Sequence, residues 1–249
     1  MVETQEVIKF CDALLNSAAW PDYAPNGLQV QGSPNIKRLV TGVTASMALI
    51  EAAIAWQADA ILVHHGYFWK NEPSTITGMK YRRIEKLIKN NINLIAYHLP
   101  LDSQPQFGNN AALANYLGLM DRTFFGSNQL GLAGYLPAPM SVAALSVKLG
   151  THLQRQPLVV GPTQPLLHHI GLCSGGAQDY LVDAAALGLD AFISGEISER
   201  TTHIAREERI TYFAAGHHAT ERDGVRLLGE QIAQKFSIDV QFVDIENPV

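Results

Sequence analysis

The chain has 249 residues, 47% of them hydrophobic, and can therefore bury a sizeable core in one large or two small domains. Its formal net charge of -5 argues against broad binding to nucleic-acid phosphates, which requires a basic face, but leaves room for one small phosphorylated ligand. No apolar run approaches the roughly 18 residues that a membrane span requires. We expect a globular protein of the cytoplasmic type without a membrane partner, and its charge disfavours a nucleic-acid partner without excluding one.

The first 17 residues predict an amphipathic helix of the mature fold. Val7, Phe10 and Leu14 recur at helical spacing, and acids rather than basic residues precede them, so the segment lacks the layout of a signal peptide. The two cysteines, Cys11 and Cys173, are far apart in the sequence. They make neither a disulfide framework nor a thiolate metal site, and we expect buried thiols.

Strand-like and helical segments then alternate along the chain. The runs RLVTGVT (38–44), DAILVHH (59–65) and INLIAYH (92–98) favour strands. ALIEAAIAW (48–56) and RRIEKLIKN (82–90) have the apolar spacing of helices. This order predicts an α/β fold with mixed sheets flanked by helices.

The second half of the chain repeats this pattern, which suggests an internal duplication. At a shift of 131 residues His65 falls on Glu196, and at a shift of 119 His98 meets His217 while Asp102 meets Glu221. Low identity makes apolar pattern alone weak support, but titratable residues occupy the equivalent strand ends. We therefore expect two related α/β halves, 1–125 and 126–249.

The second half opens with a connecting segment, in which SVAALSVKLGTHL (141–153) predicts a helix and PLVVG (157–161) a strand. We expect prolines to mark the connections between its elements. These are Pro137, Pro139, Pro157, Pro162 and Pro165.

Three histidine-bearing segments stand out: HHG at 64–66, HLPLD at 98–102 and HHATE at 217–221. Each follows an apolar strand, and in α/β sheets the ligand crevice lies beyond the carboxyl ends of the strands. Imidazole with carboxylate suits zinc, iron, manganese, cobalt or nickel. Two acids with three or more histidines favour a pair of ions about 3.5–4 Å apart.

An HH pair after a strand is, taken alone, more often a pair of loop histidines, and His-x-x-x-Glu alone is no stronger a signal, so only the combination of the three segments favours metal. His98 and His218 are the less certain ligands, and His98 could instead act in proton transfer. Glu196 could accept a hydrogen bond from a ligand or begin a helix. The remaining histidines are expected at the surface or in packing: His152, His168, His169 and His203.

Two further stretches have open interpretations. CSGGAQ (173–178) is a glycine-containing turn whose backbone N–H groups could meet a phosphate, or a tight turn that simply enters a helix, and it lacks the lysine of a P-loop. Tyr67, Phe68 and Trp69 could stack on a base or pack at the rim of the site.

Several ordered motifs together resemble one known family, the GTP cyclohydrolase 1 type 2 homologues in their short bacterial form. They are DYAPNGLQVQG, TGVTAS, DAILVHHGYFW, HLPLD followed by GNNAALA, SGGAQD, DAFISGE and AAGHHATE, in unbroken order from about residue 20 to the C-terminus. Longer family members carry an inserted domain, for which residues 126–168 leave too little room.

The resemblance implies a duplicated α/β fold, a toroidal homohexamer built as a trimer of dimers, and a dinuclear site facing its cavity. Matched motif by motif, it places the metal ligands at His64, His65, Asp102, His217 and Glu221, with an acid bridging two divalent ions per chain.

The histidine segments and the family resemblance lead to two hypotheses about function. The first is a metal-dependent hydrolase in which a metal-activated water attacks a nucleotide or a related metabolite, with His98 as the proton-transfer candidate. The alternative is a ring-shaped metal-binding or regulatory scaffold without turnover. An open coordination position favours the enzyme, and a site closed by protein ligands favours the scaffold.

Overall fold

The computed structural model describes residues 1–163 and 166–249 and divides the chain into two compact units. The first unit contains residues 1–104 and 224–246, and the second contains residues 105–223 and 247–249. Within the described residues, no helix has the length and apolar character needed to cross a membrane. Each unit is organised around one mixed sheet, so the predicted α/β class is confirmed.

The sheet of the first unit has the strand order β13-β4-β5-β6-β2. Its first four strands are parallel, and β2 joins the edge antiparallel to β6. A small antiparallel pair, β1 with β3, lies outside this sheet. The strands are β1 (Val2–Glu3), β2 (Gly27–Val30), β3 (Asn35–Ile36), β4 (Arg38–Thr44), β5 (Ala60–His65), β6 (Asn93–Ala96) and β13 (Asp239–Phe242).

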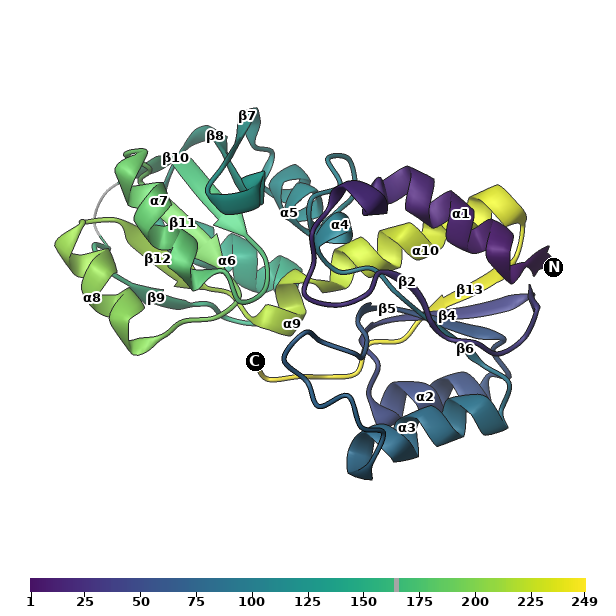
Figure 1. Cartoon of the computed structure of the whole chain (residues 1–249). Coiled ribbons are helices and arrows are strands. Elements are labelled where there is room, and N and C mark those ends of the chain that lie inside the picture. Colours follow the sequence, from purple (N-terminus) through teal and green to yellow (C-terminus); the bar gives the residue numbers. More distant parts are fainter. Residues whose placement is uncertain (164–165) are drawn as a thin grey trace. The chain divides into compact units, whose positions relative to one another are not determined.

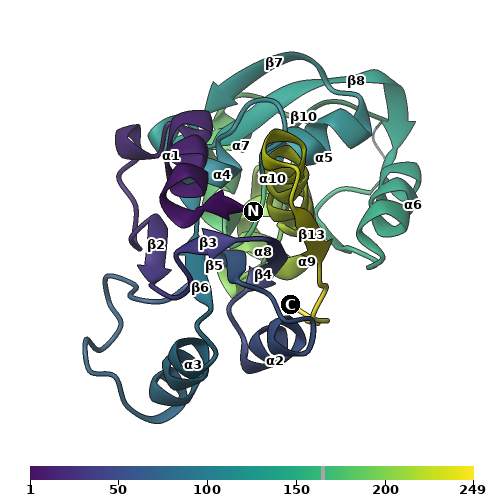
Figure 2. The ribbon, with the colours of Figure 1, turned by 90° about the vertical axis from the view of Figure 1, so that its right-hand side faces the viewer.

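Helices cover both faces of this sheet (Figure 1 and Figure 2). On one face, leucines and isoleucines of α2 (Met47–Ala55) and α3 (Gly78–Lys89) form a core with alternate residues of β4, β5 and β6. On the other lie α1 (Thr4–Leu15) and α10 (Arg222–Phe236), joined by the edge-to-face rings of Phe10 and Phe236. The short helices are η1 (Ser17–Ala19) and α4 (Leu99–Asp102).

The sheet of the second unit has the order β7-β8-β10-β11-β12-β9. Its centre, β10 to β12, is parallel, and antiparallel strands complete both edges. The strands are β7 (Met120–Phe125), β8 (Gly131–Ser141), β9 (Leu158–Val160), β10 (Leu166–Cys173), β11 (Ala191–Ser194) and β12 (Thr211–Ala214).

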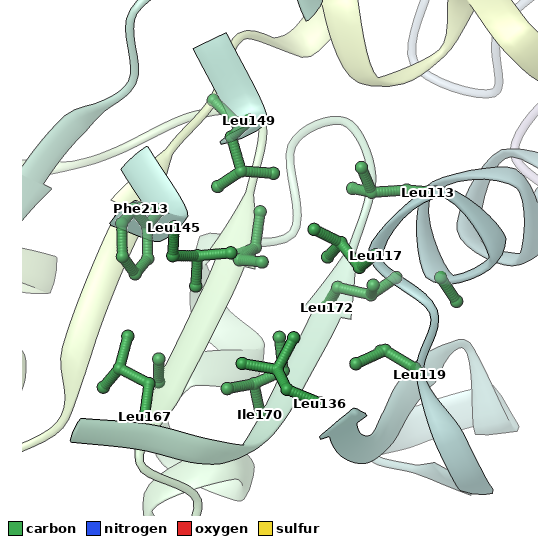
Figure 3. Packing of buried hydrophobic residues seen from close by; sticks show 14 of the residues in the cluster. Leu113, Leu117, Leu119, Leu136, Leu145, Leu149, Leu167, Ile170, Leu172 and Phe213 are labelled. Carbon is green, nitrogen blue, oxygen red and sulfur yellow. The ribbon is translucent and has the colours of Figure 1, made fainter. Parts of the chain in front are cut away.

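Two helices, α5 (Asn109–Leu117) and α6 (Val142–Leu153), cover one face of this sheet. Figure 3 shows their leucines, among them Leu113 and Leu145, packed with Ile170 and Leu172 of β10. These side chains are almost fully buried, which is the main source of stability for this unit. Its other helices are η2 (Ser127–Gln129), η3 (Gln178–Tyr180), α7 (Leu181–Ala186), α8 (Glu199–Glu207) and α9 (His217–Thr220).

Most predicted elements are present at the predicted places. The opening helix is α1, and RLVTGVT is β4. The run DAILVHH contains β5, and the connecting segment contains α6 and β9. Cys11 and Cys173 are buried thiols, as expected. The duplication behind the predicted halves, 1–125 and 126–249, stays a prediction.

One prediction about the connecting segment is wrong. Pro137 and Pro139 lie inside the long strand β8 instead of between elements. The register explains this: Tyr135 pairs with His169 and Met140 with Leu167, so several residues of β8 bulge opposite a single residue of β10. A bulge tolerates proline, because ladder hydrogen bonds are not required there. Pro165 lies outside the described residues.

Candidate metal centre

His64 occupies the end of β5 with its ring entirely buried. The run Ala60–Val63 is fully buried in the sheet, and the strand continues into His64, whose exposed fraction is 0%. Nδ1 lies 3.0 Å from the Tyr97 carbonyl oxygen, which only accepts hydrogen bonds, so in the neutral ring Nδ1 carries the hydrogen. Nε2 then presents its lone pair, and it lies 3.5 Å from Oδ1 of Asp102.

Asp102 reaches His64 from the single turn of α4. His98 precedes this turn, and its carbonyl accepts the backbone N–H groups of Leu101 and Asp102. Pro100 suits the start of a helix, where its missing N–H is not needed. Four-residue spacing places His98 and Asp102 on neighbouring positions of one turn. The carboxylate of Asp102 is almost fully buried, which is unusual without a cationic partner.

His65 and His98 gather with His64 around the same end of the sheet. The ring of His65 lies 4.6 Å from that of His64 and 5.8 Å from that of His98, measured between centroids. One ring nitrogen from each of the three histidines lies within 4.8 Å of the others. Nδ1 of His65 faces the Thr44 hydroxyl at 3.3 Å. This spacing suits imidazoles that share metal ions.

His98 is held by a carboxylate, that of Asp22. The distance from Nδ1 of His98 to Oδ1 of Asp22 is 2.7 Å, and the Asp22 side chain is only 3% exposed. Asp22 also accepts the backbone N–H of Leu99 and the Asn26 amide. Burial alone would raise the pKa of Asp22, but His98 and Asn26 outweigh it and lower that pKa to about 2. His98 is thereby oriented with Nε2 toward the neighbouring histidines.

In the second unit, the predicted pair of His217 and Glu221 is formed by α9. Nε2 of His217 lies 3.2 Å from Oε1 of Glu221, and the Glu221 side chain is 3% exposed. Nδ1 of His217 lies 2.7 Å from Oε1 of Glu196. Of the two interpretations of Glu196, the structure supports the one in which this acid accepts a hydrogen bond and orients His217.

These two acids change the proton affinity of His217. Burial lowers the pKa of an imidazole, but the hydrogen bonds and negative charges of Glu221 and Glu196 outweigh it and raise the pKa of His217 to about 9. In the absence of metal, this ring is therefore largely an imidazolium at neutral pH. The nearly buried Glu221 and the partly exposed Glu196 together favour a cation at this position, whether it is a proton on the ring or a bound metal ion.

The glycine-containing turn at 173–178 supports this pair. Gly175 has φ +67°, and a Cβ there would lie 2.2 Å from Oε1 of Glu221 and 3.2 Å from Nε2 of His217. Its N–H donates to the Thr220 hydroxyl at 3.0 Å, and its carbonyl accepts the N–H of Gly195. The close approach of the Gly175 backbone to Glu221 therefore explains why a glycine occupies this position, and no bound phosphate is needed to explain it.

Of the three aromatic residues after His65, only Trp69 accompanies the histidines. Its ring centroid lies 5.9 Å from that of His65 and 4.9 Å from that of His98. Tyr67 is buried and donates to the Ala45 carbonyl, while Phe68 packs under Lys80. Trp69 thus packs at the rim of the histidine cluster, and Tyr67 packs in the core.

Four of the remaining histidines lie at the surface or in packing contacts, as predicted, and His218 stays an undecided ligand candidate. His152 pairs with Asp223 and stacks on Tyr116, and His203 pairs with Glu199 on the surface of α8. His168 and His169 lie beside the ring of Tyr135. His218 is buried, and its backbone N–H donates to the carbonyl oxygen of Val249.

Sequence reasoning missed one residue of this arrangement, Asp22, and left the role of Glu196 open. Asp22 stands 76 positions before His98, in a loop without periodic pattern. The only signal that includes it is the DYAPNG stretch, which contributed to the family resemblance and was not assigned a role.

The residues fit a divalent ion of the zinc, iron, manganese, cobalt or nickel type. His64 and His217 each have Nδ1 occupied by an acceptor, which is the usual arrangement of a histidine that binds metal through Nε2. Each also has a buried carboxylate oxygen beside that Nε2. Imidazole nitrogen and carboxylate oxygen suit several such ions, so the identity and number of the ions stay open.

Comparison with known proteins places the whole chain in one family. Residues 2–248 match the family model described as Duf34/NIF3 (NGG1p interacting factor 3). A Vibrio cholerae protein named GTP cyclohydrolase 1 type 2 homolog is 57% identical over 246 residues, covering 96% of this chain and 98% of its own. A protein of the same name from Allochromatium vinosum is 49% identical and covers 100% of this chain and 98% of its own.

Comparison with solved structures gives the same result as the sequence comparison. A protein called ybgI, described as of unknown function, is 46% identical, with a TM-score of 0.94 and full coverage of both chains. The protein TTHA1606 of Thermus thermophilus is 31% identical, with a TM-score of 0.90 and full coverage of both chains. The motif-based expectation is therefore confirmed, and this chain belongs to the Duf34/NIF3 family, among the GTP cyclohydrolase 1 type 2 homologs.

Proposed function

We propose that this protein is a metal-dependent hydrolase with a dinuclear centre. Its proposed ligands are His64, His65, Asp102, His217 and Glu221. The observation that carries this proposal is the same in both units: a histidine with Nδ1 held by an acceptor has Nε2 beside a nearly buried carboxylate. Such histidine–carboxylate pairs at the ends of strands are typical of catalytic metal sites.

Two divalent ions at these residues would supply Lewis acidity, lowering the pKa of a bound water toward neutrality and stabilising charge that develops on the substrate. Proton transfer would be carried out by side chains of the protein. His98, oriented through Nδ1 by Asp22, is the proton-transfer group, because its Nε2 is directed to the side where His64 and His65 lie.

The substrate class is a nucleotide or a related metabolite that carries a phosphate or a ring amide. The name of the relatives, GTP cyclohydrolase 1 type 2 homolog, is compatible with nucleotide chemistry. Trp69 offers an aromatic surface beside His65 and His98 that suits a planar ring.

The wider expectations belong to the same proposal. The two halves, 1–125 and 126–249, descend from a duplication in which His98 and Asp102 correspond to His217 and Glu221. The protein acts in the cytoplasm as a homohexamer, a trimer of dimers, with the metal centres facing its cavity.

The test is metal content measured by elemental mass spectrometry on untagged protein purified without chelator. We expect about two ions per chain in the wild type and fewer in His65→Ala and Glu221→Gln. His203→Ala is the matched control, because His203 also pairs with a glutamate but lies on the surface of α8.

Loaded protein is then screened with nucleotides and cyclic amides for hydrolysis. Turnover that is absent in Glu221→Gln supports the enzyme, and full metal loading without any turnover favours the regulatory scaffold. Full activity in a variant that has lost its metal would exclude the mechanism.

A further inference from the structure

Arg155 lies at the end of the second unit's sheet from which His217 emerges. The helix α6 ends at Leu153, the next residue, Gln154, turns the chain sharply with a φ of 53°, and β9 begins at Leu158. Leu158 pairs antiparallel with Ala214, the last residue of β12. Since β12 leads directly into Gly216 and His217, Arg155 is placed at the same edge as the candidate metal ligands.

The position of Arg155 is fixed by contacts on both sides. The next residue, Gln156, donates from its side-chain amide to the Ser146 hydroxyl at 2.7 Å, which holds the segment against α6. Arg155 itself lies across Gly216, where a Cβ would be 2.6 Å from Cδ and 2.8 Å from Nε of the arginine. A side chain at position 216 would require the arginine to shift, so the backbone of the histidine motif and the arginine are closely packed.

The guanidinium of Arg155 has no acid to neutralise it among residues 1–163 and 166–249. Its Nε is buried and makes no hydrogen bond within these residues. The two acids of this edge, Glu196 and Glu221, are directed to His217 instead. A half-buried arginine normally pairs with a carboxylate, and its planar fork of donors matches a phosphate equally well.

We propose that Arg155 binds the phosphate group of the substrate beside His217. This inference rests on the proposed function, because it names the group that recognises the substrate at that centre. An arginine without a carboxylate partner is suited to bind an anion. A nucleoside monophosphate supplies such an anion, its phosphate group, together with a planar base. The competing explanation is that the arginine merely covers Gly216.

The test compares GMP, guanosine and inorganic phosphate by isothermal titration calorimetry on metal-loaded protein. Wild type is expected to bind GMP more tightly than guanosine. Arg155→Met is expected to weaken binding of GMP and of phosphate by about tenfold or more while leaving guanosine unchanged, since hydrogen bonds to a charged group contribute that much. Arg155→Lys keeps the charge without the fork and should be intermediate.

Arg206→Met is the matched control, because Arg206 is an exposed arginine of α8 in the same unit. Thermal unfolding and metal content are recorded for every variant, and Arg155→Lys serves if Arg155→Met does not fold. The proposal is overturned if wild type binds neither GMP nor phosphate, or if Arg155→Met leaves GMP affinity unchanged or weakens GMP and guanosine equally. Wild type without metal would instead contradict the proposed function.

Discussion

At the scale of single residues, the candidate centre depends on hydrogen bonds that decide which ring nitrogen each histidine presents. His64 is fixed by the Tyr97 carbonyl, His98 by Asp22 and His217 by Glu196. Such outer acceptors orient a ligand before the metal arrives and raise its basicity. They are therefore the place where a small chemical change should alter metal binding without altering the fold.

Glu196→Gln is expected to weaken metal binding by about 10–100-fold, because an amide oxygen holds His217 less firmly than a carboxylate does. Affinity is measured by competition with a chelating dye. Glu199→Gln is the control, since Glu199 makes a similar pair with His203 at 2.9 Å on the surface. Equal affinities in the two variants would show that Glu196 does not orient a ligand.

Metal binding is expected to depend on pH through His217. Its pKa is about 9 in the metal-free protein, so metal must displace a proton at neutral pH, and affinity should rise by up to about tenfold per pH unit toward 9 and then level off. In metal-free protein, folding stability is expected to change with pH in the opposite direction to metal affinity. The raised pKa means that the ion pairs of His217 stabilise the fold fully below the unfolded pKa, and that this stabilisation is lost as pH rises through about 9.

The two trends are separable by measuring chelator competition and metal-free thermal unfolding across pH 6–10. Metal affinity that stays constant over this interval would mean that His217 is not a ligand.

At the scale of elements, short turns position the chemistry while the long helices and strands only support them. The single turns α4 and α9 carry Asp102 and His217, and the turn at Gly175 closes against Glu221. Single turns have little intrinsic stability, so their geometry depends on packing by their neighbours.

Gly175→Ala is expected to abolish metal binding, because its Cβ would lie 2.2 Å from Oε1 of Glu221. Gly188→Ala is the matched control: Gly188 has φ +68°, close to the +67° of Gly175, but nothing lies within 4 Å of its Cβ. Both variants should lose about 1 kcal/mol of unfolding free energy from the left-handed backbone. Only Gly175→Ala should lose metal, as measured by mass spectrometry. If both retain it, the turn does not position Glu221.

At the scale of the whole molecule, the repeating order of strands and helices was enough to predict two mixed sheets and the strand ends that carry histidines. The β5 run that ends with His64 and His65 was predictable because burial and pattern coincide there. Asp22 and Arg155 were not, because their roles arise from loops that meet distant residues and carry no periodicity. The long strand β8 was missed because its prolines lie in a bulge that only the paired register reveals.

The central claim is that the histidine–carboxylate pairs of His64 with Asp102 and of His217 with Glu221 bind divalent metal ions. It is tested most directly by crystal structure determination with anomalous diffraction at the absorption edge of the metal found by mass spectrometry. We predict anomalous peaks beside Nε2 of His64 and beside Nε2 of His217, the two histidines whose Nδ1 is held by an acceptor. The absence of a peak at both positions would contradict the account.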